Sequence, residues 1–181
     1  EDYNLAKRKY AIVIARPEPE NSIYEIVQGF SNKKRNFKLV VLGKYDLSNN
    51  YHKKVIDAAS EDVLFIGAIY DIKVVSALRF FSALYIHGHT VGGTNPSLVE
   101  SLGTGNAVIA HDNKFNRWVA KDGAIYFSNS DDISSIFDDI LVTHEKIDKL
   151  SNLTRSNFEK NFKWDFILGQ YERLLLSYMK K

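Results

Sequence analysis

The chain has 181 residues, of which 45% are hydrophobic and 25% charged, as is usual for one globular domain with a substantial core. Its net charge of +2 gives no support to nucleic-acid binding, and the absence of cysteine excludes a disulfide framework. No apolar run approaches the ~20 residues of a membrane span, and the polar N-terminal residues do not resemble a signal peptide. We therefore expect a cytoplasmic protein. Local basic clusters leave open a weak association with the inner face of the membrane.

Short apolar runs alternate with amphipathic segments, which is the pattern of an α/β domain. The apolar runs predict strands at residues 10–15, 37–42, 63–66, 83–87, 107–110 and 124–127. Helical spacing of apolar residues predicts helices at 23–30, 51–59, 74–82, 96–102 and 115–120, then helical structure from residue 131 onward with a last helix at 164–178. Near-continuous apolar strands favour burial on both faces. We expect a doubly wound, mostly parallel, Rossmann-like sheet in a single domain spanning 1–181.

Ligands of such sheets bind beyond the carboxyl ends of the strands. Glycines, histidines and an arginine gather at these predicted ends, whereas the opposite ends show no such grouping. The residues at the carboxyl ends are Arg16, Gly43, Gly67, His87 to Gly93, His111 and Asp112.

The segment from His87 to Glu100 carries the clearest functional signal. Gly92 and Gly93 precede a predicted helix start, where Asn95 is a preferred N-cap and Pro96 suits the first helical position. Free N–H groups and the helix dipole at such a start favour an anion. Glu100 would lie just over one turn inside the helix, where a carboxylate suits the hydroxyls of a ribose. The pattern predicts a site for a nucleotide sugar.

These residues resemble motifs of the C-terminal, donor-binding domain of GT-B glycosyltransferases in the large retaining family 4. The similar motifs are Arg16 after the first strand, Phe65-Ile66-Gly67 at a strand end, and the run from Glu100 to Val108. The resemblance extends from Tyr10 to about Tyr178. It implies that Arg16 binds the donor diphosphate, that Glu100 binds the ribose hydroxyls, and that the enzyme needs no metal or other cofactor.

A narrower resemblance comes from Tyr85 to Leu98 together with Phe115-Asn116-Arg117. These runs are similar to bacterial rhamnosyltransferases of cell-wall rhamnan, capsule and O-antigen assembly, which implies a dTDP-L-rhamnose or related deoxysugar donor. Two departures from family 4 stand out. Gly92 replaces the first glutamate of the Glu-x7-Glu motif, and the usual lysine shortly after Arg16 is missing. Backbone amides, His89 or another cation would replace those contacts.

The candidate site combines this resemblance with the predicted carboxyl edge. The donor-binding candidates are Arg16, Gly67, Ile69, Val74, His89, Gly92, Gly93, Thr94, Asn95, Pro96, Ser97, Leu98 and Glu100. Arg16 and His89 are also the catalytic candidates, because each can stabilise charge that develops on a leaving diphosphate.

Three secondary assignments complete the prediction. Ile69, Tyr70 and Val74 are candidates for a thymine pocket, and Asn116 or Arg117 for contacts with the donor or an opposing domain. A metal site made of the histidines and Asp112 is a weaker alternative, because metal and phosphate would compete for one loop.

Members of this family also carry an N-terminal domain that holds the acceptor, and we expect that domain to be absent from this chain. A saccharide or lipid-linked acceptor would enter from it, so the chain alone should bind donor weakly and transfer no sugar. Two alternatives remain. One is half of a GT-B sugar-nucleotide epimerase, which the Gly-Gly-Thr-Asn-Pro run argues against. The other is a non-catalytic nucleotide-binding or interaction module. A flavodoxin-like response domain would need a cluster of acidic residues at the strand ends, and the sequence shows no such cluster.

Overall fold

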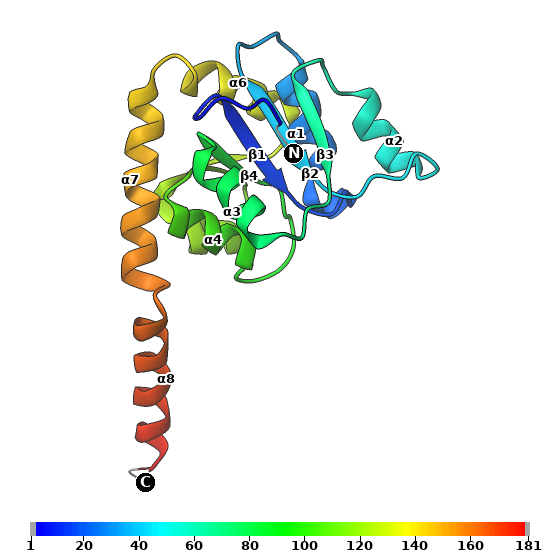
Figure 1. The fold of residues 1–181 in the computed structure, drawn as a ribbon. Helices are drawn as coiled ribbons and strands as arrows, with labels where there is room; N and C mark the ends of the chain where they lie inside the picture. Colours follow the sequence, from blue (N-terminus) through cyan, green and yellow to red (C-terminus); the bar gives the residue numbers. More distant parts are fainter. Residues whose placement is uncertain (1–2, 180–181) are drawn as a thin grey trace.

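The computed structural model describes residues 3–179. Within them, six strands form one parallel sheet in the order β3-β2-β1-β4-β5-β6 (Figure 1). The strands are β1 Tyr10–Ile14, β2 Lys38–Leu42, β3 Val63–Gly67, β4 Leu84–His87, β5 Ala107–His111 and β6 Ala124–Phe127. From β1 the sheet extends through β2 to β3, and from β4 it extends in the opposite direction through β5 to β6. The two central strands therefore form the switch point at which doubly wound sheets bind ligands. The predicted fold class is confirmed.

Helices connect the strands at the predicted places. They are α1 Ile23–Ser31, α2 Asn50–Asp57, α3 Ile72–Phe81, α4 Pro96–Thr104, α5 Lys114–Ala120, α6 Ser130–Ile140, α7 His144–Asn161 and α8 Trp164–Met179. Short 3-10 turns, Pro19–Asn21 and Lys121–Gly123, complete the chain. Most helix starts have an Asn or Asp whose side chain accepts from N–H groups of the first turn. These capping residues are Asn49, Asp71, Asn95, Asn113 and Asn129.

Both faces of the sheet are buried, as the apolar strands predict. Alternate residues point to opposite faces, so Ala11 and Val13 join one apolar cluster while Tyr10 and Ile12 join the other. Helices α1 and α6 cover the first face, and α3, α4 and α5 cover the second. The helix that follows the predicted anion site is thus packed on the second face of the sheet, where its Leu98 and Leu102 share an apolar cluster with Tyr85 of β4.

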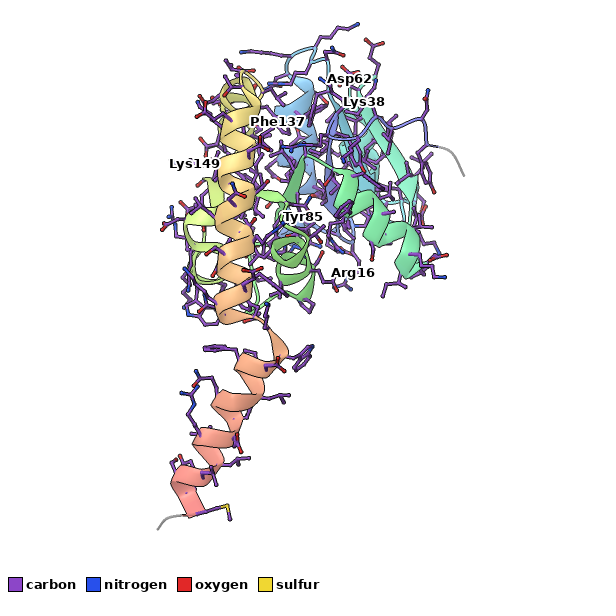
Figure 2. All side chains as sticks on the ribbon, turned by 60° about the vertical axis from the view of Figure 1, so that its left-hand side comes forward. Arg16, Lys38, Asp62, Tyr85, Phe137 and Lys149 are labelled. Carbon is purple, nitrogen blue, oxygen red and sulfur yellow. The ribbon has the colours of Figure 1, made fainter. Side chains whose placement is uncertain are left out.

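The last helix differs from the rest of the fold. Figure 1 and Figure 2 show α8 extending away from the domain, and none of its residues is buried. Its aromatic side chains are largely exposed, at 75% for Trp164 and 62% for Tyr171. They therefore do not belong to the core of the described chain. None of the helices in residues 3–179 has the length and apolarity of a membrane span.

Candidate functional site

The loops that follow β1 and β4 lie side by side at the carboxyl edge of the sheet. The backbone N–H and the hydroxyl of Thr90 donate to the carbonyl of Glu20 over 2.8 and 3.0 Å. A Cβ atom on Gly88 would lie 2.1 Å from the carbonyl oxygen of Asn21, so only glycine permits this approach. Arg16 follows β1 at this edge, and Figure 2 shows it far from Lys38 and Asp62 at the opposite edge. The structure thus places the candidate arginine and the glycine loop at the same edge of the sheet.

The loop from Gly88 to Asn95 ends at the start of α4, as predicted. The side-chain oxygen of Asn95 accepts from the N–H of Ser97 over 3.0 Å, and Pro96 is the first helical residue. Gly92 has a φ angle of +119°, which favours glycine, whereas Gly93 has open space where a Cβ atom would stand. Within residues 3–179, the N–H groups of Gly92, Gly93 and Thr94 donate to no other group. These three N–H groups can bind an anion.

Glu100 lies on α4 about one turn after its first residue, Pro96. Its Oε2 atom is 3.0 Å from Nη2 of Arg79, a residue of α3. The same Nη2 donates to the hydroxyl of Ser97 over 3.3 Å. One guanidinium group therefore contacts both the first turn of α4 and the candidate ribose-binding carboxylate. The structure places Glu100 near the glycine loop and adds Arg79, which the sequence analysis missed.

Two histidine side chains at the end of β4, those of His87 and His89, stack on each other. The rings of His87 and His89 are 4.3 Å apart between centroids and nearly parallel, and Nδ1 of His87 lies 3.3 Å from the Tyr85 hydroxyl. Burial, with a smaller effect of His89, lowers the pKa of His87 to about 3. Burial and the nearby Arg16 charge also lower the pKa of His89, against an opposing effect of Glu20. Both histidines are therefore neutral near pH 7 and can each donate one N–H hydrogen bond.

Asn116 and Arg117 both have partners within the chain. Asn116 is 3% exposed, and its side-chain amide donates to the carbonyls of His89 and His111 over 2.9 Å each. It thereby ties together the ends of β4 and β5. Arg117 is exposed and makes a paired contact with Asp112. That contact holds the pKa of the Asp112 carboxyl below its usual value.

The remaining candidates lie on the connection from β3 to α3. Gly67 ends β3 with a φ angle of +77° and is exposed. Ile69 and Val74 are partly buried against the second apolar cluster, and Val74 shares α3 with Arg79. Leu98, which follows the loop on α4, is fully buried and anchors the helix to the sheet. Ile69 and Val74 therefore pack on the face of the sheet that α4 also covers, whereas Tyr70 is 91% exposed.

The alternative metal site has no support in the geometry. Across residues 3–179, no group of three or more histidine, aspartate or glutamate side chains is placed to hold a metal ion.

No protein-family model and no curated protein sequence matches the chain. Solved structures do share its fold. Sucrose-phosphate synthase from Thermosynechococcus elongatus superimposes with a TM-score of 0.79 at 15% identity, covering 97% of this chain and 47% of that one. Anabaena HepE in complex with UDP gives 0.80 at 15%, covering 94% and 49%. The C-terminal domain of the group 1 glycosyltransferase LpcC from Francisella tularensis gives 0.71 at 19%, covering 86% and 87%.

This chain therefore spans about half the length of the first two structures. Its six-stranded parallel sheet flanked by helices has the Rossmann-like fold of GT-B C-terminal domains.

Proposed function

We propose that this chain is the donor-binding domain of a retaining glycosyltransferase and binds a nucleotide sugar at the carboxyl edge of its sheet. The observation that carries the proposal is that three free loop N–H groups come just before α4 and a carboxylate follows one turn into the same helix. Within residues 3–179, the N–H groups of Gly92 to Thr94 make no hydrogen bond, and Glu100 lies one turn into the helix that follows them. A diphosphate followed by a ribose matches this order of groups. The UDP complex of HepE, which has the same fold, is consistent with it.

Each site residue has a defined part in this proposal. The loop amides and the exposed Arg16 bind the diphosphate and stabilise its negative charge as it leaves the sugar. His89 is neutral near pH 7, so it donates a hydrogen bond to the sugar or phosphate without adding a second positive charge beside Arg16. Glu100 accepts a hydrogen bond from the pentose, through the 3′-hydroxyl of a dTDP-sugar or through the hydroxyls of a ribose. Ile69 and Val74 supply apolar contacts for the base.

The narrower part of the proposal concerns the sugars. The run from Tyr85 to Leu98 resembles rhamnosyltransferases, so we propose dTDP-L-rhamnose or a related dTDP-sugar as donor, used in cell-surface polysaccharide synthesis. The acceptor, a saccharide or a lipid-linked saccharide, would be held by a second domain. No metal or other cofactor takes part, and no nucleic acid is a partner. The protein would act in the cytoplasm or at the inner face of the membrane.

A ligand panel tests this proposal directly. Thermal shifts of the chain are measured with dTDP-rhamnose, UDP-glucose, GDP-mannose and dTDP, and dissociation constants are then measured by calorimetry. We expect dTDP-rhamnose and dTDP to raise the melting temperature most. Replacing Glu100 by Ala should reduce the shift while circular dichroism stays unchanged, because the Glu100 carboxylate is exposed.

Two results would count against the proposal. A chain that binds none of the four nucleotides is not a donor-binding domain. A Glu100→Ala variant that keeps the full shift removes the ribose assignment. If the chain prefers UDP-glucose or GDP-mannose, the proposed dTDP-rhamnose donor is wrong, but the proposal of a donor-binding domain stands. The matched control is Glu61→Ala, which removes an exposed glutamate paired with Lys34 near the opposite edge of the sheet and should keep the shift.

A further inference from the structure

Arg79 is a buried cation next to the proposed site. Its side chain is only 6% exposed, although it lies on α3, a helix with several exposed apolar residues. Nη2 contacts the Ser97 hydroxyl and the Glu100 carboxylate, while Nε is buried without a hydrogen-bond partner in the described part of the chain. The guanidinium carbon also lies 5.8 Å from the centre of the Tyr85 ring. Arg79 therefore connects α3, α4 and β4.

Stability alone gives no reason for a charge at this place. Burying a guanidinium group is costly unless its N–H groups are satisfied and its charge is closely paired. Here Nε lacks a partner, and the one carboxylate that pairs with Arg79 is 60% exposed. An apolar side chain of similar volume would fill the position at a lower cost in folding free energy. The contacts of Arg79 point instead to what it does for Glu100.

The contact with Arg79 restricts the Glu100 side chain, which would otherwise be free to rotate. An exposed glutamate on a helix samples several rotamers, and a ligand that needs one of them must meet the entropy cost. The guanidinium group is itself held by burial, by Ser97 and by the face of Tyr85, whose hydroxyl lies 2.7 Å from the Ser97 hydroxyl. Because Arg79 contacts Oε2, the Oε1 atom remains to accept from a ligand hydroxyl.

We infer that Arg79 is a positioning residue, which holds the Glu100 carboxylate in the orientation that receives the hydroxyl groups of a nucleotide ribose. The inference rests on the proposed function and deepens it. Arg79 does not touch the nucleotide. Its effect passes through Glu100, so it should govern how strongly the protein distinguishes a nucleotide with ribose hydroxyls from one without them.

The experiment compares each nucleotide with an analogue that lacks ribose hydroxyls. Calorimetry gives dissociation constants for UDP and 2′,3′-dideoxyuridine 5′-diphosphate, and for dTDP and 2′,3′-dideoxythymidine 5′-diphosphate. The ratio within each pair reports the hydroxyl contacts alone. For the wild type we expect a ratio of about tenfold, as for a hydrogen bond to a charged group. Glu100→Gln should bring the ratio close to one.

The Arg79 variants then decide the question. Arg79→Gln should weaken binding of the nucleotides with hydroxyls by about tenfold, leave the dideoxy analogues unchanged, and so bring the ratio close to one. Arg79→Lys, which keeps the charge but not the forked geometry, should restore part of the ratio. Arg79→Met fills the buried space without charge and provides a second variant if Arg79→Gln does not fold. Arg8→Gln removes an arginine paired with Asp148 elsewhere and should leave the ratio unchanged.

The outcomes separate this inference from the proposed function. If Arg79 serves only the fold, its loss weakens both members of a pair equally and the ratio persists, which overturns the inference. An unchanged ratio with unchanged affinities overturns it as well. If the wild type binds neither UDP nor dTDP, the proposed function falls and the inference falls with it. A wild type that binds UDP or dTDP but shows no hydroxyl preference removes the inference and the ribose role of Glu100, while nucleotide binding by the domain stands.

Discussion

Gly93 allows the anion site to be tested without disturbing the fold. A Cβ atom at this position meets nothing within 4 Å, and the φ angle lies outside the left-handed region that penalises side chains. Gly93→Ala should therefore leave the free energy of unfolding unchanged or raise it by about 0.4–1 kcal/mol, because alanine restricts the unfolded chain. Urea unfolding measures this difference. The neighbouring Gly92 is less suitable, since its φ angle of +119° would strain an alanine.

The same substitution should be severe for ligand binding. A phosphate oxygen accepting from the loop amides must come within about 2.9 Å of a backbone nitrogen. A methyl group on Gly93 occupies the open space through which the oxygen would approach. Losing one hydrogen bond to a charged group costs about 1.5–3 kcal/mol of binding free energy. This loss corresponds to a dissociation constant that is roughly 10- to 100-fold larger.

Calorimetry with UDP and dTDP on Gly93→Ala measures that loss. Gly169→Ala is the matched control, because Gly169 also has open space around it but lies on α8, and it should keep full affinity. Unchanged affinity in a folded Gly93→Ala protein would refute the reasoning, since it would mean that the diphosphate does not approach these amides.

Three further predictions concern stability. The folded-state pKa of His87 is about 3, below the ordinary 6.5, so falling pH protonates the unfolded chain first. Stability should therefore be lost below pH 6.5, by about 2 kcal/mol at pH 5, and urea unfolding of His87→Gln should lack this component. Gly88→Ala should cost about 1–3 kcal/mol, because its Cβ would meet the Asn21 carbonyl oxygen at 2.1 Å; a melting temperature equal to the wild type would contradict this. Phe137→Ala should cost about 3–5 kcal/mol in calorimetric unfolding, because its ring is fully buried against Phe30.

The fold was largely predictable because its strands are buried on both faces. An apolar run such as residues 107–110 is typical of a strand that is buried on both faces. Because such runs alternate with segments of helical spacing, the sequence indicates a parallel sheet covered by helices. Boundaries were less certain where a polar side chain sets them. The third helix begins at Ile72 rather than at the predicted Val74, because Asp71 accepts from the N–H groups of Lys73 and Val74.

The backbone part of the candidate site was also visible in the sequence. Asn95 and Pro96 define a helix start by their own conformational preferences, so the position of the glycine loop followed from local chemistry. Side-chain partners could not be found in this way. Arg79 and Glu100 lie on different helices, and their contact depends on how α3 packs against α4. No spacing rule within one helix indicates that contact.

The rotation of α3 about its own axis decides which of its side chains are buried. Within Leu78-Arg79-Phe80-Phe81, the hydrophobic effect alone would bury the aromatic rings and expose the arginine. The structure does the opposite for one pair: Arg79 is 5% exposed and Phe80 59%. Turning the helix to bury Phe80 would carry the guanidinium group away from Ser97 and Glu100. A helix that hides a charge and exposes a ring gives up folding free energy, and such a conflict between pattern and structure is expected where a binding site determines the arrangement.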